Sequence, residues 1–290
     1  MEKITINARA KVNLSLDVTG RRDDGYHLVE MVMQTVDLKD VIEIEKKEGN
    51  GIEIGCDFKG MPNQEDNLIY KAAKLLKDTY DIHSKIVIKL KKGIPVAAGM
   101  AGGSADAAGT LVGINELFSL GLKLDELKKL GLKLGADVPF CIEGGTYLAS
   151  GIGEKLQKIK TPNLDILIVK PDGEVSTKVV YDAYDKISPS KRPDNMNLIK
   201  GIKEGNIPLI VDSMYNVLWE VTRETITDVD NIIAKMESLG ATKAMMTGSG
   251  PTVFGIFEDL NKLKNAKEFF ETRYKETYQT KTCAGGIEIE

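Results

Sequence analysis

The sequence contains few of the side chains that bind transition metals or form disulfides. Its 290 residues include only two histidines, His27 and His83, and three widely separated cysteines, Cys56, Cys141 and Cys283. No CxxC pair is present, and an odd number of distant cysteines does not make a disulfide framework. These shortages argue against a structural zinc site, and we expect a cytoplasmic protein with reduced thiols.

An excess of basic residues and long apolar runs are also lacking. Thirty-nine Lys and Arg stand against 43 Asp and Glu, so the net charge is −4, and no stretch concentrates cations without acids among them. This balance argues against a nucleic-acid partner. No apolar run approaches the ~20 residues of a membrane span, and no signal segment begins the chain, so we expect no membrane association.

Several familiar nucleotide and nucleophile motifs are absent too. The chain has no GxxxxGK[ST], no GxGxxG between a strand and a helix, no HRD or DFG segment and no GxSxG. A Walker A loop, a protein kinase and an α/β-hydrolase are therefore excluded.

The patterns that are present predict an α+β protein of two domains, 1–160 and 161–290. Alternating apolar residues predict strands, and apolar residues at helical spacing predict helices. In the first domain we expect strands at 3–9, 11–18, 40–47, 84–92, 146–150 and 153–159, and helices at 65–80, from 104 and at 124–135. In the second we expect strands at 164–171, 243–246, 252–257 and 280–289, and helices at 176–187, 228–240 (closed by Gly240) and 260–274. The order of strands and helices in the second domain is the split βαβ arrangement of a ferredoxin-like domain.

The most unusual stretch is "PVAAGMAGGSADAAG", residues 95–109, with four glycines and six alanines. It leaves backbone N–H groups unshielded just before a predicted helix, whose N-terminus favours anions. Small residues also allow a loop to pack tightly under a sheet, and both interpretations stay open. We expect the alanines at positions with negative φ. Asp106 would repel a phosphate here unless it faces away or a cation intervenes.

Three segments in order, "AKVNLSL", "PVAAGMAGGSADAA" and "TGSGPTVFG", resemble the three motifs of the GHMP small-molecule kinases. The resemblance implies a ribosomal-protein-S5-like N-terminal nucleotide domain and a C-terminal ferredoxin-like domain that completes the substrate cleft. It also implies ATP as co-substrate, Mg²⁺, and an alcohol as phosphoryl acceptor.

Further segments, "GRRDDGYHLVE", "EDNLIYKAAKLL" and "LGADVPF", resemble the branch of that family that phosphorylates the 2-hydroxyl of a cytidine diphosphate-linked methylerythritol in the non-mevalonate isoprenoid pathway. The resemblance makes Asp137 the base that accepts the hydroxyl proton and Lys11 its electrostatic partner. Taken alone, Asp137 could equally be a helix N-cap and Lys11 a solvated strand residue.

The same resemblance assigns the binding residues. The ATP-binding set is Asn67, Pro95, Val96, Ala97, Ala98, Gly99, Met100, Ala101, Gly102, Gly103, Ser104 and Ala105. The substrate-binding set is Asn13, Tyr26, His27, Tyr181, Gly248, Ser249 and Gly250. Several have a plainer alternative: N-capping for Ser104, a turn for Asn67, ordinary packing for Tyr26 and His27, and a strand-joining turn for Gly248, Ser249 and Gly250.

Two other functions remain as alternatives. One is a GHMP kinase or decarboxylase for mevalonate-type or homoserine-type substrates, which would need basic residues where "GYH" supplies rings. The other is a GHMP-fold ligand sensor without catalysis, which the presence of both Lys11 and Asp137 disfavours.

Overall fold

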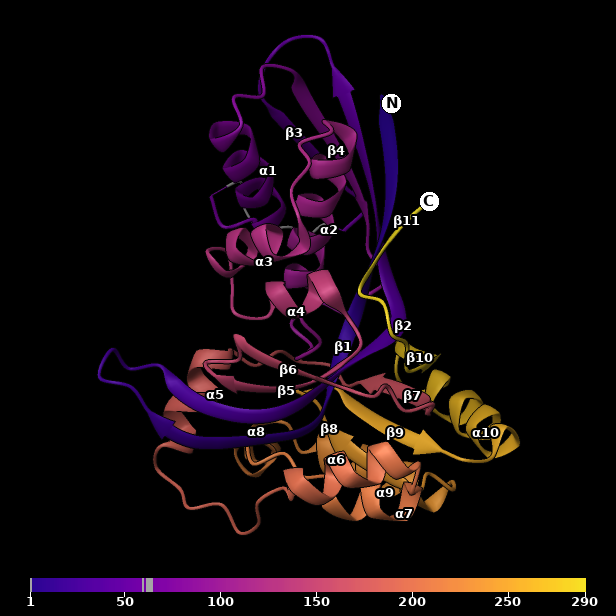
Figure 1. The fold of residues 1–290 in the computed structure, drawn as a ribbon. Coiled ribbons are helices and arrows are strands. Elements are labelled where there is room, and N and C mark those ends of the chain that lie inside the picture. The colour runs from indigo at the N-terminus through magenta and orange to yellow at the C-terminus, as the bar shows by residue number, and fades with distance from the viewer. Residues whose placement is uncertain (1, 59, 61–64) are drawn as a thin grey trace.

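The computed structural model describes residues 2–58, 60 and 65–290. Its elements form two sheets with helices packed on them (Figure 1). The first part of the chain contains β1 (Lys3–Arg21), β2 (His27–Lys47), β3 (Ile52–Cys56), α1 (Leu68–Thr79), β4 (Lys85–Lys91), α2 (Gly102–Leu117), α3 (Leu124–Leu132), α4 (Val138–Glu143), β5 (Thr146–Gly151) and β6 (Lys155–Ile159). The rest contains β7 (Asp165–Lys170), α5 (Thr177–Tyr184), α6 (Asn195–Glu204), α7 (Ile207–Ser213), α8 (Trp219–Thr225), α9 (Asp228–Ser238), β8 (Lys243–Met246), β9 (Val253–Phe257), α10 (Leu260–Glu271), β10 (Glu276–Lys281) and β11 (Ile287–Ile289).

The antiparallel hairpin of β1 and β2 organises the first sheet. The two strands pair from Lys3↔Glu45 to Arg21↔His27, with register shifts along the way. Towards its C-terminal end β2 pairs with β4, and near its start it pairs with β5, so the sheet branches around one long hairpin. Helix α2 packs on β1 and β2, and α1 packs on α2. The hairpin turn reaches beside α5 of the second half (Figure 1).

The second sheet has the order β10-β7-β9-β8, with every neighbouring pair antiparallel. Together with the sequence order of strands and helices, this is the predicted ferredoxin-like arrangement. Helices α9 and α10 pack on this sheet. The predicted two-domain α+β fold is confirmed, and the boundary near residue 160 stays a prediction.

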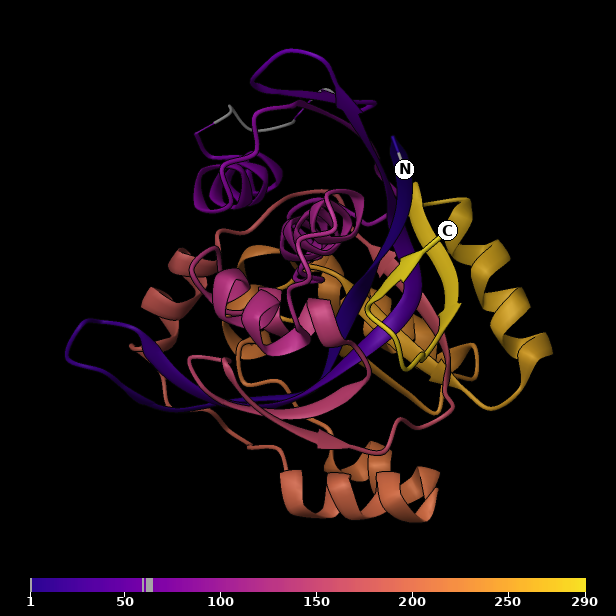
Figure 2. The same cartoon turned by 45° about the horizontal axis from the view of Figure 1, so that its top comes forward.

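The C-terminus differs from the expected single strand 280–289. Strand β10 ends at Lys281, and after a break β11 pairs with β1 in the first sheet, with Ile6 opposite Ile289. The two ends of the chain therefore lie side by side (Figure 2). The break is needed because this segment passes from one sheet to the other. At Gly286 a Cβ would stand 2.1 Å from the carbonyl oxygen of Cys141.

One hydrophobic core runs through both halves, and the strands of the long hairpin contribute to it along most of their length. Among the described residues, no helix is long and apolar enough to cross a membrane.

Candidate active site

A cavity of about 1080 Å³ lies between the two halves of the molecule. Much of its wall comes from the β1–β2 hairpin, residues 95–106, the start of α4, the first turns of α5 and the turn after β8, and residues at the end of β3, the start of α1 and the end of β4 also line it. All of the sequence-predicted site residues line it except Ala105 and Gly250. The motifs quoted above are therefore brought together in one place.

The loop between β4 and α2 is packed backbone against backbone on the turn after β8. A Cβ on Gly99 would lie 2.3 Å from the carbonyl oxygen of Thr247, and one on Gly248 would lie 2.6 Å from that of Gly99. Both glycines also have positive φ, +68° and +58°. Only glycine fits either position, so part of the small-residue run exists for close packing.

The expectation that the alanines of this loop have negative φ is wrong at two positions. Ala97 and Ala101 have φ of +51° and +57°. The left-handed conformation costs an alanine about 1–2 kcal/mol. The loop's tight path, fixed by the glycine contacts next to it, imposes this conformation whatever the side chain.

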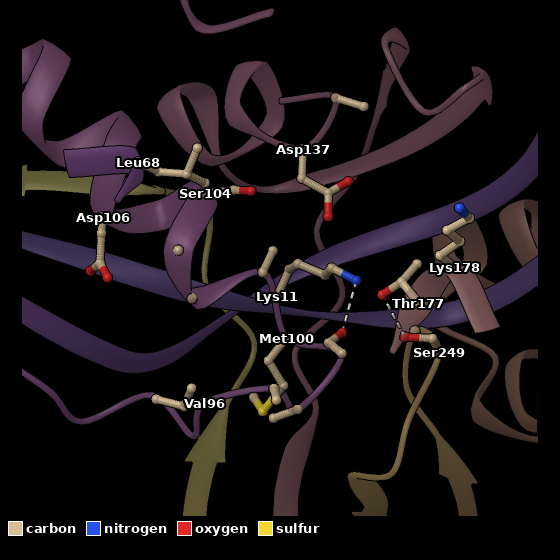
Figure 3. A pocket seen from close by; sticks show the side chains of 18 of the residues that line it. Lys11, Leu68, Val96, Met100, Ser104, Asp106, Asp137, Thr177, Lys178 and Ser249 are labelled. Carbon is tan, nitrogen blue, oxygen red and sulfur yellow. Dashed lines mark hydrogen bonds between the residues drawn. The ribbon is translucent and has the colours of Figure 1, made fainter. Parts of the chain in front are cut away.

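The loop leads into α2, which begins at Gly102 rather than at Ser104. Its N-cap residue is Ala101, whose side chain makes no capping bond. The first-turn N–H groups of a helix have no partner inside the helix, so they are available to an anion. Ser104 lies in this first turn and is not the N-cap. Its hydroxyl points towards the space beside Asp137 (Figure 3).

Lys11 lies on β1 and is 5% exposed. Its Nζ donates to Asn13 Oδ1 at 2.6 Å and to the carbonyl oxygen of Gly99 at 2.9 Å. Burial lowers the pKa of Lys11, and the nearby charge of Asp137 acts in the opposite direction. Both hydrogen-bond partners are acceptors, which favours the charged ammonium. The structure thus ties the predicted lysine and asparagine to each other and to the loop.

Asp137 stands at the N-cap position of α4, before Val138 and Pro139, but its side chain makes no capping bond. Its carboxylate points into the same space as Lys11 Nζ (Figure 3). The negative charge of Asp137 also contributes, after burial, to raising the pKa of the Tyr181 hydroxyl. The sequence places an Asp at a helix start, and the structure directs that side chain into the cavity.

Asn67 fits its plainer interpretation well. It is the N-cap of α1, and its Oδ1 accepts from Ile69 N at 2.9 Å. It also lines the cavity, as the glycine-rich loop does. Both roles are compatible with this geometry.

The other end of the cavity is aromatic. Tyr26, in the hairpin turn, is 62% exposed, whereas the His27 and Tyr181 rings pack together with centroids 4.8 Å apart and a tilt of 32°. His27 comes from β2 and Tyr181 from α5, so the two halves of the chain meet in this pair. A planar ring such as a nucleobase would find π-faces here.

Asp106 lies one turn into α2 and is buried. Its side chain points away from Lys11 and Asp137 (Figure 3). Lys92 Nζ lies 3.0 Å from its Oδ2 and also bonds Asp40, which is fully buried. Lys92 therefore neutralises part of the negative charge of Asp106, which reduces the expected repulsion of a phosphate. Sequence reasoning missed Lys92 and Asp40, because nothing in either local pattern marks them.

The structure adds other lining residues that the sequence did not indicate. Thr177 opens α5, and its Oγ1 lies 3.0 Å from Ser249 Oγ. Met31 accepts from Asn13 Nδ2 at 3.1 Å. The only available signal for Thr177 was its place in the "ST" pair that begins the predicted helix 176–187, and Met31 offered none.

Two protein-family models match the chain. The model described as GHMP kinases N terminal domain matches residues 67–145, and the one described as GHMP kinases C terminal matches residues 198–276.

Curated relatives match it over nearly full length. A 4-diphosphocytidyl-2-C-methyl-D-erythritol kinase of Thermoanaerobacter pseudethanolicus is 44% identical over 289 residues, which covers 100% of this chain and 99% of the relative. The kinase of the same name from Clostridioides difficile is 47% identical over 294 residues, covering 100% and 98%.

Solved structures of kinases are similar to this chain over nearly its full length. A crystal structure of 4-(cytidine 5'-diphospho)-2C-methyl-D-erythritol kinase has a TM-score of 0.83 at 28% identity, with 97% of this chain and 100% of that chain covered. A homoserine kinase from Cytophaga hutchinsonii has a TM-score of 0.78 at 20% identity, covering 100% and 98%, which shows a shared fold.

Proposed function

Since the chain belongs to the 4-diphosphocytidyl-2-C-methyl-D-erythritol kinases of the GHMP kinase family, we propose that Asp137 and Lys11 carry its phosphoryl transfer. The enzyme is a kinase with ATP as co-substrate. It transfers the γ-phosphoryl group of ATP to the 2-hydroxyl of 4-diphosphocytidyl-2-C-methyl-D-erythritol, in the non-mevalonate isoprenoid pathway.

The observation that carries the proposal is the position of Asp137. A carboxylate at a helix start would ordinarily cap that helix, yet this one makes no capping bond and faces the cavity. It accepts the proton of the substrate hydroxyl and orients the oxygen in line with the γ-phosphorus. Phosphoryl transfer has a loose transition state, so this orientation matters more than strong basicity.

Lys11 supplies positive charge next to the transferred group. Its bonds to Asn13 and to the Gly99 carbonyl hold the ammonium at one place on the cavity wall. A charge fixed before the reaction needs no reorganisation as charge develops on the phosphoryl oxygens. Asn13 would then contact the substrate through the same short network.

The loop 95–101 and the first turn of α2 bind the ATP phosphates through main-chain N–H groups. Mg²⁺ is commonly held by phosphate oxygens, water and one or two protein oxygens rather than by a full protein cage. The described residues contain no cluster of three or more His, Cys, Asp or Glu that could hold a metal. Ser104 Oγ would be a protein ligand, and the ion would neutralise part of the phosphate charge.

The aromatic end binds the cytosine. Tyr26 and Tyr181 provide ring faces, and His27 provides a hydrogen-bonding edge, while Gly248 and Ser249 face the middle of the substrate. All three cysteines are free thiols, which supports a cytoplasmic location.

The test is ADP release from Mg-ATP with 4-diphosphocytidyl-methylerythritol, beside mevalonate, homoserine and galactose. We expect turnover with the first alone. Asp137→Asn keeps the shape of the side chain, and we expect kcat to fall by about 10²–10⁴ with ATP binding retained. Turnover with another alcohol would overturn the substrate assignment, and an active Asp137→Asn enzyme would overturn the role of the base.

A further inference from the structure

One ring nitrogen of His27, Nε2, is held by a carboxylate from the other half of the chain. His27 Nε2 lies 2.7 Å from Oδ1 of Asp185, the residue that follows α5. The second oxygen, Oδ2, accepts from Arg21 Nη1 at 2.9 Å. The side chain of His27 is only 9% exposed, so this contact and the packing against the Tyr181 ring fix the orientation of the imidazole.

We propose that Asp185 is a positioning residue for base recognition, which sets the tautomer and orientation of His27 so that Nδ1 offers a lone pair to the bound base. This inference rests on the proposed function. It concerns a residue that touches His27 and not the reacting atoms.

The chemistry follows from the contact. A carboxylate only accepts hydrogen bonds, so Nε2 must carry the proton of the neutral ring. The lone pair then lies on Nδ1. The exocyclic amino group of cytosine is a donor and suits that lone pair, whereas a uracil bound in the same pose places an acceptor oxygen there. The hydrogen bond from His27 lowers the pKa of Asp185, so the carboxylate is charged at neutral pH.

The molecule contains a matched control for a purely structural role. Arg192 Nη1 donates to Asp17 Oδ1 at 2.6 Å, which also joins β1 to the second half of the chain. This pair does not involve His27. Asp17→Asn therefore removes a carboxylate that bridges the two halves without changing the histidine.

The first readout is the tautomer itself. The chain has two histidines, and His83 is 83% exposed in its side chain, so ¹⁵N-histidine spectra contain two rings that His83→Gln assigns. Spectra are recorded about two pH units above the ordinary histidine pKa of ~6.5. We expect Nε2–H for His27 in the wild type and in Asp17→Asn. In Asp185→Asn the amide can donate to Nε2, and we expect a shift towards Nδ1–H.

The second readout is kinetic. In Asp185→Asn we expect KM for the cytidine substrate to rise about tenfold, the upper range for one hydrogen bond, with kcat and KM for ATP within about twofold. We also expect the preference for the cytidine over the uridine analogue to shrink. Asp17→Asn should show neither change.

If the wild-type enzyme turns over normally and the His27 tautomer is unchanged in Asp185→Asn, the inference is overturned. So does an equal rise in KM in Asp17→Asn, because it would mean that any bridge between the halves suffices. Absence of turnover by the wild type would instead defeat the proposed function, and it would be seen without either variant. Thermal unfolding confirms that both variants are folded.

Discussion

Lys92 is expected to be the most sensitive charged residue for stability, because it is the cation between two buried carboxylates. Asp40 is fully buried and Asp106 nearly so, and Lys92 bonds both. We predict that Lys92→Met, which keeps the apolar stem, destabilises the fold. Removing one partner of a buried ion pair typically costs about 3–5 kcal/mol.

The structure refines this magnitude. Asp40 keeps two backbone bonds, from Gly93 N at 2.6 Å and Ile94 N at 2.8 Å, so its charge stays solvated by the protein. Asp106 Oδ1 has no partner among the described residues, so without Lys92 its carboxylate must protonate. Protonating an Asp of unfolded pKa ~3.9 at pH 7 costs about 4 kcal/mol, at 1.36 kcal/mol per unit.

In the wild type, the burial of Asp106 already reduces the free energy of unfolding by part of this amount. Burial above all, and then the charge of Asp40, raise the pKa of Asp106 well above its ordinary value. A raised folded pKa favours folding below the unfolded pKa, and this contribution is lost as pH rises through the folded pKa. Removing Lys92 raises the folded pKa of Asp106 further, so in the variant stability is lost over a pH range that extends to higher pH. We therefore expect a loss of about 2–4 kcal/mol at pH 7, which shrinks to about 1 kcal/mol at pH 5.

Urea unfolding at the two pH values measures this. Lys92→Met with Asp106→Asn should recover most of the loss, because asparagine carries no charge. Lys91→Met, at the exposed neighbouring lysine, is the control and should change stability by less than about 0.5 kcal/mol. A loss in Lys92→Met that is the same at pH 5 and pH 7, or that the second substitution does not relieve, would refute the reasoning.

Two further predictions concern the loop and Lys11, the proposed catalytic lysine. Gly99→Ala should destabilise the fold by about 2 kcal/mol or more and raise KM for ATP, because a Cβ there meets the Thr247 carbonyl oxygen at 2.3 Å and φ is positive. The control is Gly103→Ala, whose Cβ meets only a Leu68 methyl at 3.6 Å and should leave the unfolding midpoint nearly unchanged. Equal unfolding midpoints for the two variants would contradict the packing argument. Burial lowers the pKa of Lys11, so kcat should fall as pH rises through a value below 10.5; a profile that is flat up to pH 10.5 would show that the ammonium is not needed.

Hydrophobic periodicity predicted most of the elements, because strands such as β4 and helices such as α9 show clean patterns over their length. The end of the chain was mispredicted because 280–289 contains β-forming residues on both sides of a break. Whether such a segment continues or crosses to another sheet depends on partners far away in sequence. Ile289 pairs with Ile6, at the opposite end of the chain.

The resemblance located the candidate site better than local pattern did. Lys11 and Asp137 are unremarkable in their own segments, and it was the order of the motifs that placed them in one cavity. What no motif indicated was support from distant residues. Lys92 with Asp40, and His27 with Asp185, are separated by 52 and 158 residues, and each side chain by itself resembles ordinary surface charge.

The two interpretations of the glycine-rich stretch concern different residues of it. Gly99 faces the turn after β8 without room for a side chain, and its carbonyl oxygen accepts from Lys11. Gly102 and Gly103 begin α2, where N–H groups are free for an anion. The loop thus joins the two halves of the molecule at the residue that holds the ammonium of Lys11, the proposed catalytic lysine. Under the proposed function, a displacement of that joint would move Lys11 relative to the bound phosphates, and packing at Gly99 would then affect catalysis.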